Sequence, residues 1–260
     1  MVTALVVLDG LRPDAIPLAS TPHLDAFSEA GSSTMSAVTV VPPVTLPAHT
    51  SMLTSAPPSD HGVIDNTWNP AARMFANFVD QVALAGKPPV AFYTWEPLRD
   101  LWSPGSMTAT WYRNLDWRTD GDHYVAEAVG EFFRNSDADF AFVYLGSIDI
   151  AGHLHGWMSD AYLDQIGTVD DALGGVLEGL GSGATAVVTS DHGGHDRVHG
   201  IDHPDDLTIP WLIAGPGIRR NHRLASEVSL LDTAPTLAHA MGLNSPSSWQ
   251  GQAVFEAFEV

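Results

Sequence analysis

The chain lacks cysteine and has very little positive charge. It contains no Cys and only one Lys, Lys87, and its 11 basic residues face 31 acidic ones, giving a formal net charge of −20. Such a surface repels phosphate backbones and offers no basic stripe, so we predict that polymeric nucleic acid is not a partner. Two explanations of the acidity stay open, namely life at high salt and carboxylates that bind metal ions.

Long apolar runs are also absent. No stretch approaches the ~20 residues that span a bilayer, and the first nine residues lack a basic stretch and a cleavage site. We therefore expect no membrane partner and, if this is the full product, a cytoplasmic location, with which the absence of Cys agrees. A length of 260 residues with 45% hydrophobic content is typical of a globular protein, and we predict one domain over residues 1–260.

Apolar, β-branched runs alternate along the chain with stretches of helical periodicity. Strands are expected at 4–8, 36–41, 90–93, 140–145, 184–189 and 209–214. Helices are expected at 21–30, 48–54, 74–85, 123–133 and 162–180. This alternation predicts an α/β fold in which helices cover both faces of a mainly parallel sheet, which is a three-layer α/β/α sandwich.

The segment 95–120 does not follow this pattern. It has little regular periodicity and contains four tryptophans, at Trp95, Trp102, Trp111 and Trp117. One interpretation is a lid or pocket wall over a site. The other is an irregular packed excursion whose tryptophans belong to the core.

Acidic and histidine side chains follow the predicted strands directly. Asp9 follows the first strand and precedes Gly10, so its carboxylate can project while the backbone turns, although for Asp9 taken alone a helix cap or a loop hydrogen bond is the preferred explanation. Asp149 and His153 are four residues apart, on one side of a helical turn, and offer ligands suited to Zn²⁺ or Mn²⁺. Such a pair is alternatively a hydrogen-bonded surface pair.

A second group follows the strand at 184–189. Asp191 and His192 come first, and His195, His199 and His203 follow at spacings of four. A catalytic metal site needs three or four protein groups and an open position, so these residues cannot all be ligands. The spacing alone does not choose among the last three histidines.

Thr45 and Asn66 lie in loops that could supply a nucleophile and an oxyanion contact. Thr45 precedes the helix expected at 48–54, where backbone amides favour a phosphate. Its hydroxyl is a poor nucleophile without a metal or a base, and nothing near it resembles a Ser/His/Asp triad, so metal activation is preferred over a base. The alternatives are a helix cap for Thr45 and a turn residue for Asn66.

Taken in order, these stretches resemble the alkaline phosphatase superfamily, and most closely its type I phosphodiesterase/nucleotide pyrophosphatase branch. The resemblance spans nearly the whole chain. It rests on LDGLRPD at 8–14, TLPAH at 45–49, HGVIDN at 61–66, Asp149 with GH at 152–153, SDHG at 190–193, HG at 199–200 before GPG at 215–217, and DTAPTL at 232–237.

The resemblance implies an alkaline phosphatase-like fold and two divalent metal ions, most often zinc, with manganese or iron as alternatives. One ion would be held by Asp149, His153 and His199, and the other by Asp9, Asp191, His192 and the Thr45 oxygen. Thr45 would attack phosphorus in line to give a phospho-threonine, which water activated by the first metal would release. Asn66 would bind a nonbridging phosphoryl oxygen. His199 is preferred because Gly200 and a later Gly-Pro turn follow it, with His195 and His203 as its rivals.

The predicted function is hydrolysis of a small phosphodiester, pyrophosphate or phosphomonoester. Sulfatase activity is disfavoured, because sulfatases of this superfamily need a Cys or Ser before Pro-x-Arg and this chain has Thr45 before PAH. The alternatives are a phosphonate hydrolase such as a phosphonoacetate hydrolase and a noncatalytic metal-binding protein, against which Thr45 and Asn66 argue. Tryptophans of 95–117 are expected to stack on the leaving group, and Arg12 or Arg99 to neutralise a second phosphate charge. The sequence does not indicate an oligomeric state.

Overall fold

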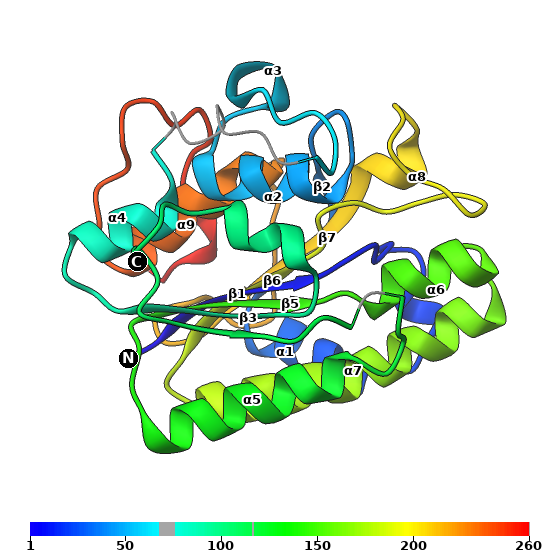
Figure 1. Ribbon diagram of the computed structural model, residues 1–260, viewed down its shortest axis with the longest axis horizontal. Helices are drawn as coiled ribbons and strands as arrows, with labels where there is room; N and C mark the ends of the chain where they lie inside the picture. The colour runs from blue at the N-terminus through cyan, green and yellow to red at the C-terminus, as the bar shows by residue number, and fades with distance from the viewer. Residues whose placement is uncertain (68–75, 116, 260) are drawn as a thin grey trace.

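A single eight-stranded sheet forms the centre of the computed structural model, which describes residues 1–67, 76–115 and 117–259 (Figure 1). The strand order is β4-β3-β5-β1-β6-β7-β2-β8. β7 is antiparallel to both of its neighbours, and the other adjacent pairs are parallel. The strands are β1 (Thr3–Leu8), β2 (Ser32–Val38), β3 (Pro89–Tyr93), β4 (Ala109–Tyr112), β5 (Phe140–Leu145), β6 (Thr185–Thr189), β7 (Thr208–Ala214) and β8 (His222–Arg223).

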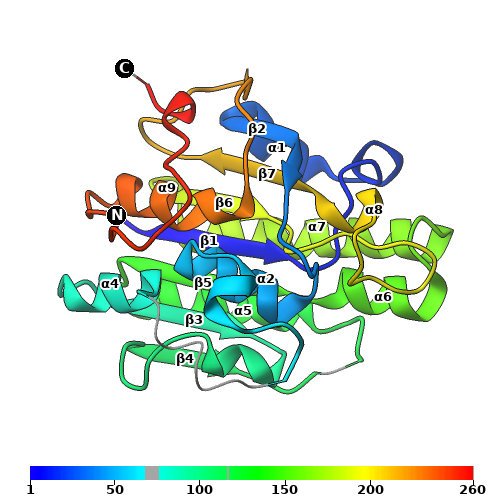
Figure 2. The same ribbon diagram turned by 90° about the horizontal axis from the view of Figure 1, so that it is seen from above.

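Helices cover both faces of this sheet (Figures 1 and 2). One face carries α1 (Pro22–Ala30), α5 (Asp122–Asn135) and α7 (Asp160–Leu180). The other carries α2 (Thr45–Thr54), α4 (Phe78–Leu84) and α9 (Thr233–Ala240). The short helices are α3 (Pro58–His61), α6 (Ser147–His155) and α8 (Pro204–Leu207), and the 3-10 turns are η1 (Ile16–Leu18), η3 (Glu96–Asp100), η4 (Leu230–Asp232) and η5 (Phe255–Ala257). The described helices include none that is long and apolar enough to cross a bilayer.

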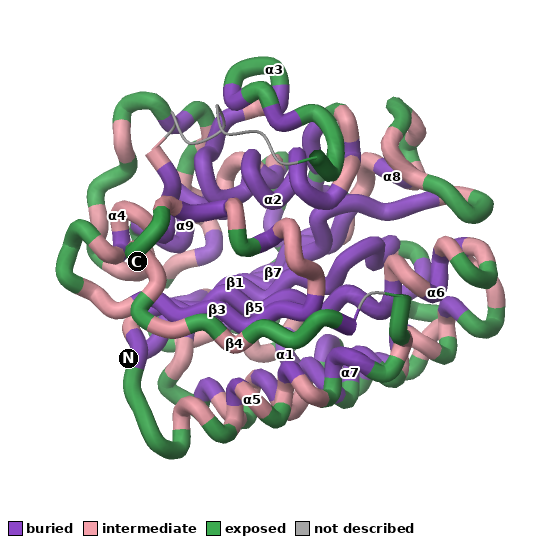
Figure 3. The backbone as a smooth tube through the Cα atoms, viewed as in Figure 1, coloured by how far each residue is buried: buried purple, intermediate pink, exposed green. Residues whose placement is uncertain are grey.

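The central strand β1 shows why the apolar runs are continuous. Leu5 and Val7 point into the core under α2, whereas Val6 and Leu8 point into the core over α5 and α7. A strand buried on both faces gains nothing from polar alternation. Figure 3 shows the result, a buried sheet with exposed positions on the outer faces of α5 and α7. The predicted three-layer α/β/α sandwich with a mainly parallel sheet is therefore confirmed.

Several element boundaries differ from the sequence prediction. β2 spans Ser32–Val38 and not 36–41, because its first residues are polar but buried and paired, as when the Ser32 hydroxyl donates to the Arg219 carbonyl. α2 begins at Thr45 and not at 48, since a proline is tolerated in a first turn whose N–H groups have no helical partner. α4 begins at Phe78, and the first two positions of the helix expected at 74–85 lie outside the described residues.

The tryptophan-rich segment is less irregular than predicted. It contains η3 and the edge strand β4, which pairs with β3 in parallel. Trp102 is buried in the core and Trp111 is half-buried on β4, whereas Trp95 and Trp117 line a pocket. Each interpretation of the segment thus describes part of it, and a lid role remains a prediction.

Candidate active site

The predicted metal ligands come together at the carboxyl edge of the parallel strands. β1 lies between β5 and β6, so Asp9 after β1 adjoins α6, which follows β5, and Asp191, which follows β6. The chain turns sharply at Gly10, whose φ of +74° and close approach to Asp149 exclude a larger residue, because a Cβ there would lie 2.8 Å from the Asp149 Cα.

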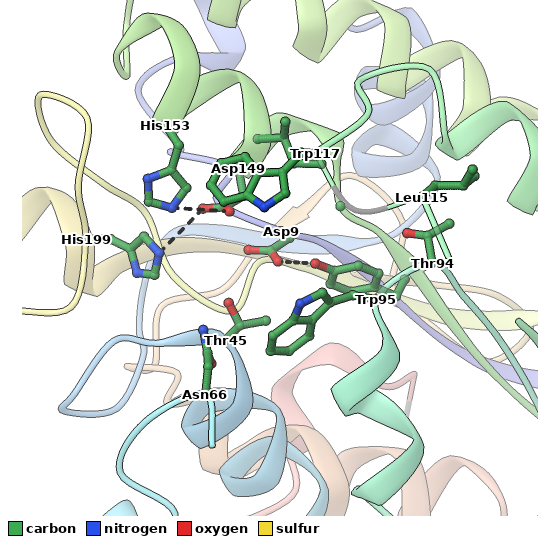
Figure 4. Close-up of a pocket in the computed structure, with 13 residues that line it drawn as sticks. Asp9, Thr45, Asn66, Thr94, Trp95, Leu115, Trp117, Asp149, His153 and His199 are labelled. Atoms are coloured by element: carbon green, nitrogen blue, oxygen red, sulfur yellow. Dashed lines mark hydrogen bonds and ion pairs between the residues drawn. The ribbon is translucent and has the colours of Figure 1, made fainter. Parts of the chain in front are cut away.

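The first ligand group consists of Asp149, His153 and His199 (Figure 4). The imidazole Nε2 atoms of His153 and His199 lie 3.5 and 3.6 Å from the Asp149 carboxylate oxygens. Their Nδ1 atoms lie 2.9 Å from the backbone carbonyls of Arg197 and Pro43, respectively. A carbonyl only accepts, so each Nδ1 carries a proton and each Nε2 faces the Asp149 carboxylate.

The second group consists of Asp9, Asp191 and His192, which are all buried. The Nε2 atom of His192 lies 3.4 Å from the Asp9 carboxylate, 3.5 Å from the Asp191 carboxylate and 3.2 Å from the Thr45 hydroxyl. Its Nδ1 donates to the Gly193 carbonyl at 2.8 Å. The rings of His192 and His199 stack with centroids 3.7 Å apart, so the two groups adjoin.

Both groups fit divalent cations. Asp9 Oδ1, Asp149 Oδ1 and Asp191 Oδ2 are buried, and none has a hydrogen-bond partner in the part of the chain that the structure describes. An unpaired buried carboxylate oxygen is costly unless a cation or a donor meets it. Carboxylate oxygens facing imidazole nitrogens form a mixed oxygen and nitrogen donor set of the kind that Zn²⁺ and Mn²⁺ accept.

The carboxylates of the site repel one another, which is the electrostatic setting that a cation would relieve. Burial, and then the charges of Asp191 and Asp149, raise the pKa of Asp9 well above its usual value. Burial lowers the pKa of His192, so its imidazole is neutral, as a ligand must be. Divalent ions would relieve the repulsion among the three carboxylates.

Thr45 and Asn66 face the same space. Thr45 is the first residue of α2, and Val44, not Thr45, is the N-cap residue, which argues against a capping role. The Asn66 Oδ1 atom accepts the Leu46 N–H at 2.9 Å, and Asn66 lines the pocket, where its amide N–H groups are the donors that its side chain can offer. This bond ties Asn66 to the residue that follows Thr45.

Three supporting residues were not predicted from the sequence. The Tyr144 hydroxyl donates to Asp9 Oδ2, and Asp122 accepts the Gly146 and Ser147 N–H groups at the start of α6. Trp157 donates its indole N–H to the Gly10 carbonyl at 3.0 Å and lies beside the His153 and His199 rings. Tyr144 and Trp157 have the appearance of core residues in the sequence, and Asp122 carries no motif, so only the fold reveals their contacts.

A pocket of about 170 Å³ opens over the Thr45 side of the site. Its aromatic wall is formed by Trp95 and Trp117, with Leu115 between them in the sequence (Figure 4). The complete lining is Asp9, Thr45, Asn66, Thr94, Trp95, Leu115, Trp117, Tyr144, Gly146, Asp149, Ile150, His153 and His199.

The structure does not support the two predicted cationic contacts. Arg12 is buried and donates to the carboxylates of Asp14 and Asp205 and to the Gly194 carbonyl. Arg99 pairs with Glu96 within η3. Neither arginine lines the pocket, because each guanidinium is held by a nearby acidic side chain.

The rival histidines lie in a separate cluster. His195 and His203 stack with ring centroids 4.4 Å apart and group with Asp206, whereas His199 groups with Asp149 and His153. The geometry thus places the preferred histidine in the first ligand group. Its role as a metal ligand remains a prediction.

Comparison with known proteins assigns the sequence to a family. The family model described as type I phosphodiesterase/nucleotide pyrophosphatase matches residues 3–208, most of the chain. The GPI ethanolamine phosphate transferase 2 catalytic subunit of Homo sapiens is 25% identical over 274 residues, covering 98% of this chain and 28% of that protein. Phosphopentomutase of Herpetosiphon aurantiacus is 30% identical over 122 residues, covering 46% and 30%, respectively. The chain therefore spans less than a third of the length of these curated relatives.

Solved structures share the fold. Murine ectonucleotide pyrophosphatase/phosphodiesterase 5, in an inactive form in complex with AMP, matches with a TM-score of 0.83 at 15% identity, covering 99% of this chain and 98% of that chain. The phosphonate monoester hydrolase of Silicibacter pomeroyi matches with a TM-score of 0.76 at 15% identity, covering 97% and 76%. These neighbours belong to the alkaline phosphatase superfamily, as the motifs predicted. Because the family model matches most of the sequence, the chain belongs to the type I phosphodiesterase/nucleotide pyrophosphatase family.

Proposed function

We propose that this protein is a metal-dependent hydrolase that cleaves small phosphate esters through a phospho-threonine at Thr45. The observation that carries the proposal is the convergence of three buried carboxylate oxygens, of Asp9, Asp149 and Asp191, on imidazole nitrogens beside the Thr45 hydroxyl, with no hydrogen-bond partner for these oxygens among the described residues. A purely structural metal site has no use for a hydroxyl nucleophile or for Asn66 at its open side.

The two ligand groups would hold two divalent cations, zinc first among the candidates. One cation would be bound by Asp149, His153 and His199, and the other by Asp9, Asp191, His192 and the Thr45 oxygen. Such cations neutralise charge on the phosphoryl group and favour ionisation of a bound hydroxyl.

Thr45 and Asn66 would have different roles in the reaction. The Thr45 oxygen forms a bond to phosphorus while the ester oxygen leaves and is protonated as the alcohol. The Asn66 amide donates to a nonbridging phosphoryl oxygen and stabilises the charge that develops there. Water next cleaves the Thr45–phosphate bond, which releases phosphate or a phosphate monoester and restores the threonine hydroxyl.

The pocket suits a small substrate with an aromatic or apolar ester group. Its volume of about 170 Å³ is small, since ligand pockets commonly measure roughly 300–1,000 Å³. Trp95 and Trp117 offer ring faces to a leaving group. Among the described lining residues there is no Arg or Lys, so a second anionic group would find no side-chain cation in this part of the wall.

A panel of substrates tests the proposal. Zinc- or manganese-loaded protein is assayed with bis-p-nitrophenyl phosphate, p-nitrophenyl phosphate, a nucleotide diester and phosphonoacetate. We expect turnover of a phosphate ester, loss of turnover in Thr45→Ala, and a ³²P-labelled protein on quenching with labelled substrate that Thr45→Ala does not give. Turnover of phosphonoacetate alone would instead favour a phosphonate hydrolase.

Metal analysis provides an independent test. We expect two equivalents of divalent metal in the loaded protein and one fewer in His153→Ala. If no substrate is turned over and Thr45→Ala changes nothing, the hydrolase proposal is wrong. Fewer than two equivalents in the zinc-saturated protein would contradict the paired site.

A further inference from the structure

We infer that Asp206 is a positioning residue for both ligand groups, acting through the segment 193–201 that joins them. Asp206 touches neither ligand group and does not line the pocket, yet its side chain is fully buried. The inference rests on the proposed metal binding of the site and assigns a role to a residue outside it.

Asp206 binds the segment at both of its ends. Its backbone carbonyl accepts the Gly193 N–H at 2.9 Å, next to the ligand residue His192. Its Oδ2 atom accepts the Gly200 N–H at 2.9 Å and the Ile201 N–H at 3.3 Å, just beyond His199.

The remaining oxygen of Asp206 holds the middle of the segment. Its Oδ1 atom lies 2.6 Å from Nδ1 of His195, and a carboxylate oxygen accepts from the protonated ring nitrogen. His195 and Val198 exchange two backbone hydrogen bonds, of 3.0 and 2.9 Å, which close the turn between them. Asp206 thus binds one residue before this turn, one within it and two after it.

This segment orients all three imidazoles of the proposed site. The Gly193 carbonyl fixes the ring of His192, the Arg197 carbonyl fixes the ring of His153, and His199 belongs to the segment itself. Asp196, Arg197 and Val198 are exposed, so burial of their side chains does little to hold the turn. Hydrogen bonds must therefore supply the rigidity, and a buried carboxylate makes strong ones.

The neighbouring cluster of His195, His203 and Asp206 has the residue types of a third metal site but not its geometry. The His195–Asp206 contact of 2.6 Å is a hydrogen bond, whereas the proposed ligand groups hold nitrogen and oxygen 3.4–3.6 Å apart. Both Asp206 oxygens have donors, and His203 Nδ1 accepts the Asp205 N–H at 3.2 Å. Both carboxylate oxygens of Asp206 are thus hydrogen-bonded without a cation, which favours a positioning role over a third metal site.

The test compares Asp206→Ala with Asp206→Asn, His195→Ala and His203→Asn. Zinc affinity is measured by competition with a chelator, and cobalt-loaded protein is followed by its visible absorption, which reports ligand geometry without turnover. Asp206→Ala should raise the zinc dissociation constant about 10- to 100-fold, the usual range for residues that orient ligands, and should shift the cobalt spectrum. Asp206→Asn should restore most of the affinity, because its amide can accept from Gly200 and donate to the other tautomer of His195.

His203→Asn is the matched control. It removes the ring that stacks on His195 but keeps an N-cap acceptor for α8, so zinc affinity and the cobalt spectrum should stay as in the wild type. His195→Ala should weaken zinc binding less than Asp206→Ala, because the backbone bonds of Asp206 remain. His195 is only half-buried, so we expect His195→Ala to fold, and this variant decides the question if Asp206→Ala does not fold.

Three results would overturn the inference. The first is a wild-type zinc affinity and cobalt spectrum in folded Asp206→Ala, or in His195→Ala if Asp206→Ala is unfolded. The second is binding of three zinc equivalents by the wild type, with one lost in His203→Asn. The third is no metal binding by the wild type, which also removes the basis of the proposed function. If the wild type binds two metal ions but cleaves no ester, the proposed function fails while the metal-affinity comparison still decides the role of Asp206.

Discussion

The hydrogen bond from Tyr144 to Asp9 links a core side chain directly to the proposed metal site, and Tyr144→Phe removes only that bond. The buried ring of Tyr144, on β5, keeps its edge contact with His49 of α2, so packing is unchanged. The side chains of Asp9 and Tyr144 are both almost inaccessible, at 1% and 5% residue exposure, so water cannot easily replace the lost donor. Asp9 Oδ2 would then become a second unpartnered oxygen on the same carboxylate.

The expected effect follows from the strength of that bond. A hydrogen bond to a charged group contributes about 1.5–3 kcal/mol, and 1.4 kcal/mol corresponds to a tenfold change in an equilibrium constant. Because the metal-bound form needs an ionised Asp9, losing the donor should weaken zinc binding by about 10- to 100-fold. The bond also lowers the pKa of Asp9, whose burial raises it, so the pH at which zinc binding is half-maximal should rise in Tyr144→Phe.

Chelator competition between pH 5 and pH 8 measures both quantities, and Tyr93→Phe is the matched control. Tyr93 is a buried tyrosine at the end of the adjacent strand β3, and its ring packs on Trp102 and not on a ligand. Tyr93→Phe should leave zinc affinity and its pH midpoint unchanged. The reasoning is refuted if Tyr144→Phe binds zinc within about twofold of the wild type, with the same pH midpoint.

Three further changes test the packing, the electrostatics and the pocket. Gly194→Ala places a Cβ 2.3 Å from the Trp157 ring and should lower the free energy of unfolding by about 1–3 kcal/mol in denaturant titrations. The control Gly183→Ala meets no described atom within 4 Å and should not lower it, so equal losses in the two variants would contradict the predicted clash with Trp157. Burial and neighbouring carboxylates raise the pKa of Asp9, so the folded metal-free protein binds an extra proton above the usual carboxyl pKa and loses stability as pH rises. Asp9→Asn should therefore raise the melting temperature in chelator at pH 8 more than at pH 4, and a pH-independent difference would count against this. Trp117→Ala should raise KM for an aryl phosphodiester about 2- to 10-fold with an unchanged melting temperature; an unchanged KM would remove Trp117 from the binding surface.

The fold, and the meeting of the predicted ligand residues at one edge of the sheet, could be predicted from the sequence because both depend on local order. Asp9 and Asp191 stand directly after runs that are buried on both faces, and the ends of neighbouring parallel strands must meet at one edge. His199 could not be chosen from spacing alone, since His195 and His203 repeat the same interval. Its position is set by contacts from far away in the chain, such as the bond from its ring to the Pro43 carbonyl.

Other parts of the site left no trace in the sequence for a physical reason. Tyr144 lies in an apolar strand 135 residues from its partner, so its hydroxyl is invisible to any local pattern. Arg12 stands in a motif beside Asp9, yet the fold turns its guanidinium away toward Asp14 and Asp205. Its position next to Asp9 in the sequence led to the prediction that Arg12 contacts the substrate, whereas in the structure its guanidinium is paired with Asp14 and Asp205.

The three imidazoles of the proposed site show the same limit most clearly. Each is oriented by a backbone carbonyl, from Pro43, Gly193 or Arg197, and every residue type has a carbonyl to offer. A sequence motif can therefore indicate the proposed ligand residues but not the backbone carbonyls that orient their rings. It follows that side-chain substitution at Arg197, whose side chain is exposed, should be tolerated, whereas inserting one residue beside it should displace the carbonyl and disorient His153. For the proposed metal site, we therefore expect metal affinity, measured by chelator competition, to depend on backbone register more than on side-chain identity in this segment.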